Sequence, residues 1–240
     1  MSNIVIYEGD SYKEFYPFTI NHATFEIRVG LGTLLDSFTH NNNNKIILVV
    51  RDSLKNIMEE RYPDAIVNPD KIPNDCKKIH LSKVLKASNL FYFSGCSKDI
   101  SNPDWVGVPD KKSIMINQND IHISESAVVS AGVILDASKG HIIIDDNALI
   151  DLGAIVKGPA YIGKNSVINP GAKLKDVTIG PYCKIGGEVE HTTFHGYSNK
   201  QHDGYLGHSY IGEWVNLGAN TNNSDLKNNY SNIRVNIGDK

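Results

Sequence analysis

Three histidines lie within the segment 195–208 of this chain, together with two tyrosines and several amide side chains: His195, His202 and His208. A neutral imidazole has an ordinary pKa of about 6.5, so a histidine can take a proton from a substrate near neutral pH. Imidazole is also a common zinc ligand, but the spacings of seven and six residues do not match a usual zinc site. The residue types therefore favour acid–base chemistry, and no metal site is predicted.

A six-residue repeat surrounds these side chains. From Ile144 to Leu174 an aliphatic residue recurs at every sixth position, and after a one-residue deletion the frame resumes at Ile179 and Ile185. A period of six fits neither an amphipathic helix nor an alternating strand, but it fits a parallel β-helix whose coils stack their aliphatic residues inward. One coil cannot bury its own interior, so several stacked coils are expected.

Lys200 interrupts this pattern. The frame continues through Phe194, Lys200 and Leu206 to Ile211 and Leu217, which assigns a lysine to a slot that should face the core. A buried unpaired ammonium is very costly, so the sequence predicts that the backbone departs from the regular coil near Lys200. Polar groups at an interruption of a rigid scaffold are where we expect the chemistry.

Composition sets the general class. The 240 residues carry a net charge of -3, with 40% hydrophobic and 21% charged residues, so neither nucleic-acid nor membrane attraction is indicated. The start MSNIVIYEGD does not resemble a signal peptide, and Cys76, Cys96 and Cys183 have no metal spacing. We expect a soluble, cytoplasmic protein with buried thiols.

The first half has a different pattern from the second. Short aliphatic runs at 4–7 and 45–50 predict buried parallel strands, with helices at 30–40 and 53–62 and further strands at 65–68 and 90–93. Strands that alternate with helices suggest a Rossmann-like half-domain. We predict an α/β domain over 1–105, a linker over 106–120, and a β-helix over 121–240.

The repeats, together with the segment GYSNKQHDGYLGHSYIGEWVNLGANTNNSDLKNNY, resemble a known family. It is the bifunctional glucosamine-1-phosphate N-acetyltransferase / N-acetylglucosamine-1-phosphate uridyltransferase family, in its short Bacteroidetes/archaeal-type variant. The resemblance implies a left-handed parallel β-helix that forms homotrimers and uses acetyl-CoA. It extends weakly to PFTINHATFEIRVG at 17–30, which is similar to a reduced nucleotidyltransferase signature.

The family's motifs carry over to individual residues. Its pattern His-x-x-Tyr-Leu-Gly matches His202 to Gly207, which implies that His202 is the general base and that Tyr205 contacts the substrate. Its Val-Asn-Ile-Gly-Ala-Gly-Thr segment matches 215–221. The resemblance implies that Asn216 binds the sugar phosphate and that Ala219 and Thr221 lie along acetyl-CoA.

Cations are needed for a sugar phosphate, and the candidates are Lys200, Lys227 and Arg234. The chain departs from the family elsewhere, because an Asn-Tyr pair is replaced by Asp225-Leu226 and an arginine aligns near Asn169. Family members also continue for further coils, so the resemblance predicts a shortened or truncated member.

Three functions remain open from the sequence. The first is an acetyl-CoA-dependent N-acetyltransferase acting on an amino-sugar 1-phosphate, with glucosamine 1-phosphate as the foremost substrate. The second is a nucleotidyltransferase that uses UTP and Mg²⁺. The amides of the stretch 28–32, opening a helix, could bind an anion, although a loop packed onto a helix N-terminus is the favoured interpretation of these residues. The third is a non-catalytic trimeric scaffold that binds a sugar nucleotide.

Overall fold

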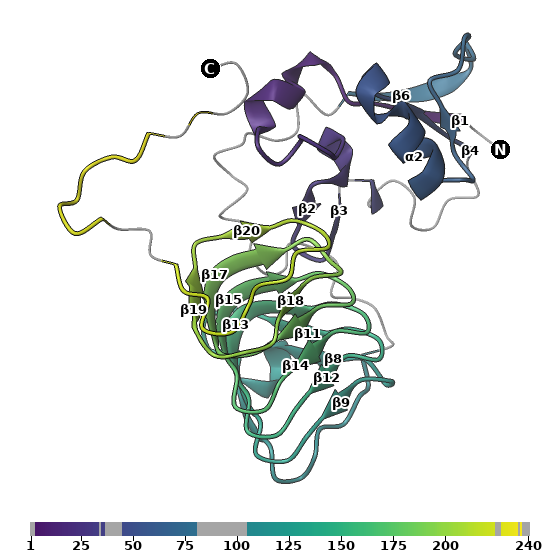
Figure 1. Ribbon diagram of the computed structural model, residues 1–240. Helices are drawn as coiled ribbons and strands as arrows, with labels where there is room; N and C mark the ends of the chain where they lie inside the picture. Colours follow the sequence, from purple (N-terminus) through teal and green to yellow (C-terminus); the bar gives the residue numbers. More distant parts are fainter. Residues whose placement is uncertain are drawn as a thin grey trace. The chain divides into compact units, whose positions relative to one another are not determined.

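The computed structural model describes residues 3–33, 35–36, 45–80, 105–223, 227–234 and 236. The described chain divides into two compact units, one built mainly from residues 3–27 and 32–80 and the other from 28–31 and 105–234 (Figure 1). None of the helices in these described stretches is both long and apolar enough to cross a membrane.

The first unit is a small parallel α/β sheet. Its strands are β1 (Asn3–Tyr7), β4 (Lys45–Val49), β5 (Ile66–Val67) and β6 (Cys76–His80), in the order β5-β4-β1-β6. Every neighbouring pair is parallel, and Ile4–Ile6 of β1 and Ile47–Leu48 of β4 are buried because helical segments pack on the sheet. These segments are η1 (Asp10–Phe15), η2 (Thr24–Glu26), η3 (Asp52–Leu54) and α2 (Lys55–Arg61).

The predictions for this half are confirmed in part. The strands at 4–7, 45–50 and 65–68 and the helix at 53–62 correspond to β1, β4, β5 and α2. The predicted helix at 30–40 is wrong at its start, because Arg28–Val29 (β2) and Gly32–Thr33 (β3) are extended. The strand predicted at 90–93 lies outside the described residues.

The second unit is a parallel β-helix, as the six-residue repeat predicts (Figure 1). Three stacks of short parallel strands form its faces: β7-β10-β13-β15-β17-β19, β8-β11-β13-β15-β17-β20 and β9-β12-β14-β16-β18. The strands are β7 (Ile114–Ile116), β8 (Ile121–Ile123), β9 (Val128–Val129), β10 (Ile134–Asp136), β11 (Ile142–Ile144), β12 (Leu149–Ile150), β13 (Ile155–Ile162), β14 (Val167–Ile168), β15 (Lys173–Ile179), β16 (Lys184–Ile185), β17 (Glu188–Phe194), β18 (Asn199–Lys200), β19 (Tyr205–Gly207) and β20 (Tyr210–Ile211), with η6 (Gln118–Asp120) between β7 and β8.

The repeat positions form the core of this unit. The six aliphatic residues from Ile144 to Leu174 are at most 1% exposed, and Ile179 and Ile185 are fully buried. The interior thus consists of aligned columns of side chains, one from each coil. Strand β7 lies inside the predicted linker 106–120 and pairs with β10, so the β-helix begins before residue 121.

The frame also holds beyond residue 190. Phe194, Lys200 and Leu206 are buried, and Ile211 and Leu217 pack against the core. The predicted backbone irregularity at Lys200 is wrong, because β18 pairs in register with β16 and its neighbour Asn199 bridges to Asn216. The coil stays regular because the ammonium finds acceptors of its own, as described next.

Candidate functional site

A pocket of about 390 Å³ opens on the upper coils of the β-helix. It contains one predicted site residue, Tyr205, and the two residues that precede it. Its lining is small and polar: Gly171, Lys173, Gly187, Glu188, Asp203, Gly204, Tyr205 and Asn222. Glycines at three of these positions keep the pocket open, and charges of both signs surround it.

Two of the charged lining residues belong to one column with Tyr205. Lys173 pairs with Glu188 across β15 and β17, and Glu188 pairs with Tyr205 across β17 and β19. A cation, an anion and a phenol therefore stand one above the other at the pocket wall. Lys173, Glu188, Asp203 and Asn222 were not predicted as site residues. For two of them the sequence holds a signal, because Lys173 directly precedes the inward residue Leu174 and Glu188 directly precedes the inward residue Val189.

Asparagine side chains complete the edge of β19. The Tyr205 N–H donates to Asn222 Oδ1 at 2.7 Å, and the Gly207 N–H donates to Asn223 Oδ1 at 2.8 Å. The Asn223 amide also donates back to Gly207 O at 2.8 Å. These side chains act as the next strand would, and so fix the backbone that carries Tyr205. The Tyr205 hydroxyl lies over Gly207, where any Cβ would come within 2.3 Å of it.

The other predicted site residues of these coils, His202, Asn216, Ala219 and Thr221, do not line the pocket. His202 is exposed and stands one residue before the lining residue Asp203. Asn216 and Ala219 are exposed as well, whereas Thr221 is half-buried and its carbonyl lies over Gly204. The structure thus brings His202, Tyr205 and Thr221 around one loop.

Lys227 and Arg234 are in the exposed segment 227–234. The Lys227 Nζ bonds within that segment, to Ser231 Oγ at 3.5 Å and Asn232 O at 3.3 Å. Asp225 and Leu226, which replace the family's Asn-Tyr pair, lie outside the described residues. A role for either cation in phosphate binding stays a prediction.

Lys200 is used differently from the prediction. Its side chain is 1% exposed, and its Nζ donates to the carbonyls of Gly186 at 3.0 Å, His202 at 3.0 Å and Gly204 at 2.8 Å. Burial lowers the pKa of this ammonium, and the nearby Asp203 carboxylate opposes that shift. Because its three donors point into the coil, Lys200 has no exposed face with which to bind a phosphate.

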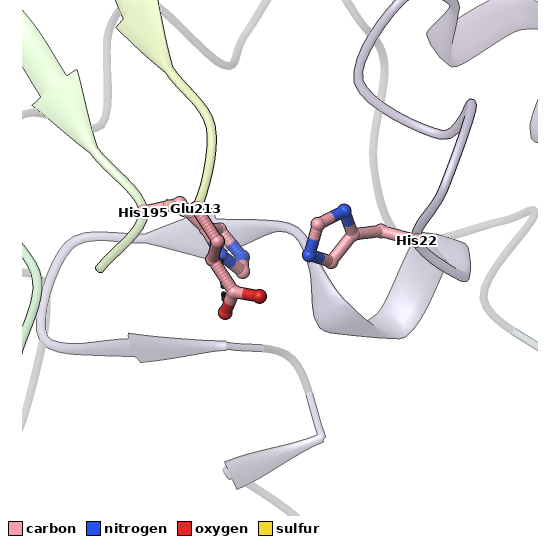
Figure 2. A group of neighbouring side chains, drawn as sticks. All are labelled: His22, His195 and Glu213. Atoms are coloured by element: carbon pink, nitrogen blue, oxygen red, sulfur yellow. Dashed lines mark hydrogen bonds and ion pairs between the residues drawn. The ribbon is translucent and has the colours of Figure 1, made fainter. Parts of the chain in front are cut away.

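The remaining histidines have separate partners. His195 is buried, and its Nδ1 lies 3.0 Å from Glu213 Oε1 (Figure 2). Its carbonyl accepts from Arg28 Nε at 2.8 Å. His208 stacks on His191 with 4.8 Å between ring centres. His202 thus stands apart from the other two histidines of its segment and is the one beside the pocket.

A buried ion pair lies next to the parallel sheet of the first unit. The buried Glu8, which follows β1, forms an ion pair with Arg51, which follows β4, and also accepts the Arg51 N–H at 3.1 Å. The Arg51 guanidinium also donates to Ile20 O at 3.2 Å and stacks over the Tyr12 ring at 4.5 Å. Burial raises the pKa of Glu8, an effect opposed by Arg51.

The acidic residue of the predicted nucleotidyltransferase signature is satisfied in the same way. Glu26 is buried, accepts from Arg61 at 2.9 Å and from Tyr62 at 3.2 Å, and binds the Ala23 N–H at 2.7 Å. The prediction that residues 28–32 open a helix, and so offer its free amides to an anion, is wrong. These residues belong to two short strands, β2 and β3, and to the turn between them.

The second unit is a parallel β-helix built on a six-residue repeat, and its sequence has distant and partial similarity to curated proteins described as bifunctional protein GlmU. A bifunctional protein GlmU from Thermodesulfovibrio yellowstonii is 34% identical over 107 residues, which cover 43% of this chain and 23% of that protein. The GlmU proteins of Buchnera aphidicola subsp. Baizongia pistaciae and Synechococcus sp. (strain CC9605) are 30% and 28% identical, over 31% and 47% of this chain.

The chain spans 23 to 30% of the length of these three relatives. No family model matches the sequence. Among solved structures, a mutant perosamine N-acetyltransferase from Caulobacter crescentus in complex with CoA and GDP-perosamine covers 75% of this chain and 91% of its own, at 13% identity and a TM-score of 0.22. Likeness at that level carries no weight for the function of this chain.

Proposed function

We propose that the β-helix is an N-acetyltransferase that moves the acetyl group of acetyl-CoA to an amino-sugar 1-phosphate, with glucosamine 1-phosphate as the foremost substrate. The observation that carries the proposal is the polar pocket beside His202, which contains Tyr205 and side chains of both charges. The partial similarity to bifunctional GlmU proteins supports the same reaction class.

The residues divide the chemistry between them. His202 takes a proton as the sugar amine attacks the thioester carbonyl, and that proton later goes to the departing CoA sulfur. Lys173 supplies the cation for the sugar phosphate in place of the buried Lys200. Glu188 and Asp203 are anions at the same wall, suited to the hydroxyls and the incoming amine. Tyr205 contacts the sugar, and backbone N–H groups near Ala219 stabilise the oxyanion.

The test is thiol release from acetyl-CoA in the presence of glucosamine 1-phosphate or galactosamine 1-phosphate. His202→Ala should lower kcat by roughly two to four orders of magnitude, because a positioned general base contributes about that much. His208→Ala is the matched control, since it removes an exposed histidine six residues away and should leave kcat within about threefold. Equal activity of wild type and His202→Ala would disprove the assigned base.

Lys173 has a test of its own. Lys173→Met keeps the length of the side chain and removes its charge, so KM for the sugar phosphate should rise about tenfold or more, since a charge-assisted hydrogen bond is lost. The KM for acetyl-CoA is the internal control and should stay within about twofold. If both KM values are unchanged, the phosphate is bound elsewhere, with Lys227 and Arg234 the next candidates.

The proposal leaves nucleotidyl transfer aside. Glu8 and Arg51, which follow β1 and β4, are paired with each other, which leaves less charge at these strand ends for a nucleotide phosphate or Mg²⁺. A homotrimer remains part of the proposal, resting on the family resemblance. Sedimentation equilibrium should give three times the 26.5 kDa chain mass, and a monomer would contradict it.

A further inference from the structure

One inward column of the β-helix contains a charged residue. Four successive coils contribute Val129, Ile150, Ile168 and Ile185 to the same position, joined by the parallel register of β9, β12, β14 and β16. The next coil contributes Lys200 in the same register and at the same degree of burial. A lysine has thus replaced an aliphatic residue at the level of the pocket.

The surroundings of its ammonium are complete. Three hydrogen bonds of 2.8 to 3.0 Å join Nζ to the carbonyls of Gly186, His202 and Gly204, which matches the three donors of an ammonium group. One acceptor belongs to the coil below, and the other two flank Asp203 in the loop that leads from His202 to Tyr205. The ammonium therefore ties this loop to the coil beneath it.

Glycines make room for this arrangement. A Cβ at Gly187 would lie 2.8 Å from the Lys200 Nζ and 3.0 Å from His202 O, and Gly187 has a φ of +71°. A Cβ at Gly204 would lie 2.4 Å from Thr221 O, at a φ of +125°. The ammonium and the Gly204 carbonyl thus fill the space beside Gly187, whereas the Thr221 carbonyl fills the space beside Gly204, and a side chain at either position would need displacement of its neighbours.

We propose that Lys200 is a positioning residue of the acetyltransferase site, which holds the 202–205 loop in its working conformation from inside the β-helix. The inference rests on the proposed function. The trans peptide is planar, so a carbonyl drawn inward turns the following N–H outward. At Gly204 this orients the Tyr205 N–H, which donates to Asn222 Oδ1 at 2.7 Å. At His202 it orients the Asp203 N–H, beside the pocket.

Lysine suits this role because of its length and its compact head. Methionine has a similar length and no donor, whereas arginine would bring a planar fork that does not match three converging carbonyls. Lys200→Met should therefore keep the core filled while removing the ammonium from the three carbonyls, of which that of Gly204 keeps its second donor, the Glu188 N–H at 3.1 Å. The loop would then lose its internal tie without losing any side chain that contacts substrate.

The experiment compares Lys200→Met with Leu206→Met, a volume-conserving change at a buried neighbouring core position. Kinetics should show kcat lowered about tenfold to a hundredfold in Lys200→Met, as for other residues that support a site, with both KM values within about threefold. Hydrogen exchange of the full chain should be faster at the amides of Gly186, Glu188 and Tyr205, with the coils between 142 and 185 unchanged.

The outcomes separate the two proposals. Wild-type exchange and kcat in Lys200→Met would overturn the positioning role, and equal loss of kcat in Leu206→Met would reduce it to general packing. If the wild type releases no thiol, the proposed function fails, while the exchange comparison still decides whether Lys200 orders the loop. Should Lys200→Met not fold, Gly187→Ala displaces the ammonium but keeps the lysine, and should speed exchange at the same amides.

Discussion

The coils before and after residue 185 share one repeat, but the first set (the lower coils) has only an apolar interior, whereas the second set (the upper coils) also carries a polar pocket. Between Ile142 and Ile185 every inward position is aliphatic or small and almost completely buried. Above it, one inward position is a lysine, and the wall carries Glu188, Asp203 and Tyr205 around a pocket. The lower coils behave as a rigid base, and the upper coils combine the same register with groups that can bind and react.

The difference shows that the β-helix tolerates a polar residue inside only where the backbone is adapted to it. At Lys200 the adaptation consists of three converging carbonyls and glycines at 187 and 204. At Ile168, two coils lower in the same column, the neighbours are Ile150 and Ile185. The most direct test of this difference is to place a lysine at position 168.

Ile168→Lys should destabilise the protein by at least about 3 to 5 kcal/mol at pH 7, since an uncompensated charge is buried. Its pKa in the folded state would be depressed, so the unfolded chain binds more protons and stability should recover as the pH rises toward about 10. Urea unfolding at both pH values measures this, with Ile168→Met, expected within about 1.5 kcal/mol of wild type, as the control. A variant as stable as that control would mean that the lower coils accept a lysine as readily.

Much of the base was predictable from the sequence, because a six-residue period admits few structures. The inward residues from Ile144 to Leu174, and the frame through Phe194, Lys200 and Leu206, are where the repeat puts them. The backbone at Lys200 was predicted wrongly. The prediction assumed an unpaired buried charge, whereas the ammonium has backbone acceptors, one of which, the Gly186 carbonyl, belongs to another coil.

The site was predictable only where it is local in sequence. His202 and Tyr205 stand in one short motif, and the structure puts both on one loop. Lys173 and Glu188 join Tyr205 through register, and the separations differ, with 15 residues in the first step and 17 in the second. No single spacing aligns all three residues, so their pairing at one wall cannot be read from a fixed period in the sequence.

Cys183 tests how completely the lower coils exclude water from their core, and the expected change in stability is smaller than that for Ile168→Lys. Its side chain is fully buried, and burial raises the pKa of the thiol from 9.0 to about 11. A thiol kept neutral by the fold contributes stability that is present below pH 9 and lost as the pH rises through 11. The loss should be about 2 to 3 kcal/mol at most.

The measurement is the free energy of unfolding between pH 8 and 11, compared between wild type and Cys183→Ala. The variant should lack the additional alkaline loss, although it is less stable at pH 8 because a buried side chain is shortened. Parallel pH profiles for the two proteins would show that the thiol ionises as readily in the folded chain as in the unfolded one, and that this part of the core admits water.

The smallest effect concerns the corners that join the coils. At one corner, successive coils place Asn147, Asn165, Tyr182, Tyr197 and Trp214 at φ between 52° and 60°. Asparagine tolerates this left-handed region, whereas a bulky residue there costs about 1 to 2 kcal/mol. The three aromatic residues accept the cost because their rings stack, with centres 5.3 Å apart for Tyr182–Tyr197 and 5.0 Å for Tyr197–Trp214.

Tyr197→Asn gives the upper corner the residue type of the lower one. Two ring contacts of about 0.5 to 1.5 kcal/mol each are lost, and backbone strain of similar size is relieved, so the free energy of unfolding should change by less than about 1 kcal/mol. Tyr197→Ala loses the contacts without asparagine's tolerance of this conformation, and should be the less stable of the two. Equal stability of the variants would mean that φ at this corner carries little strain, and that stacking alone distinguishes the upper corners from the lower.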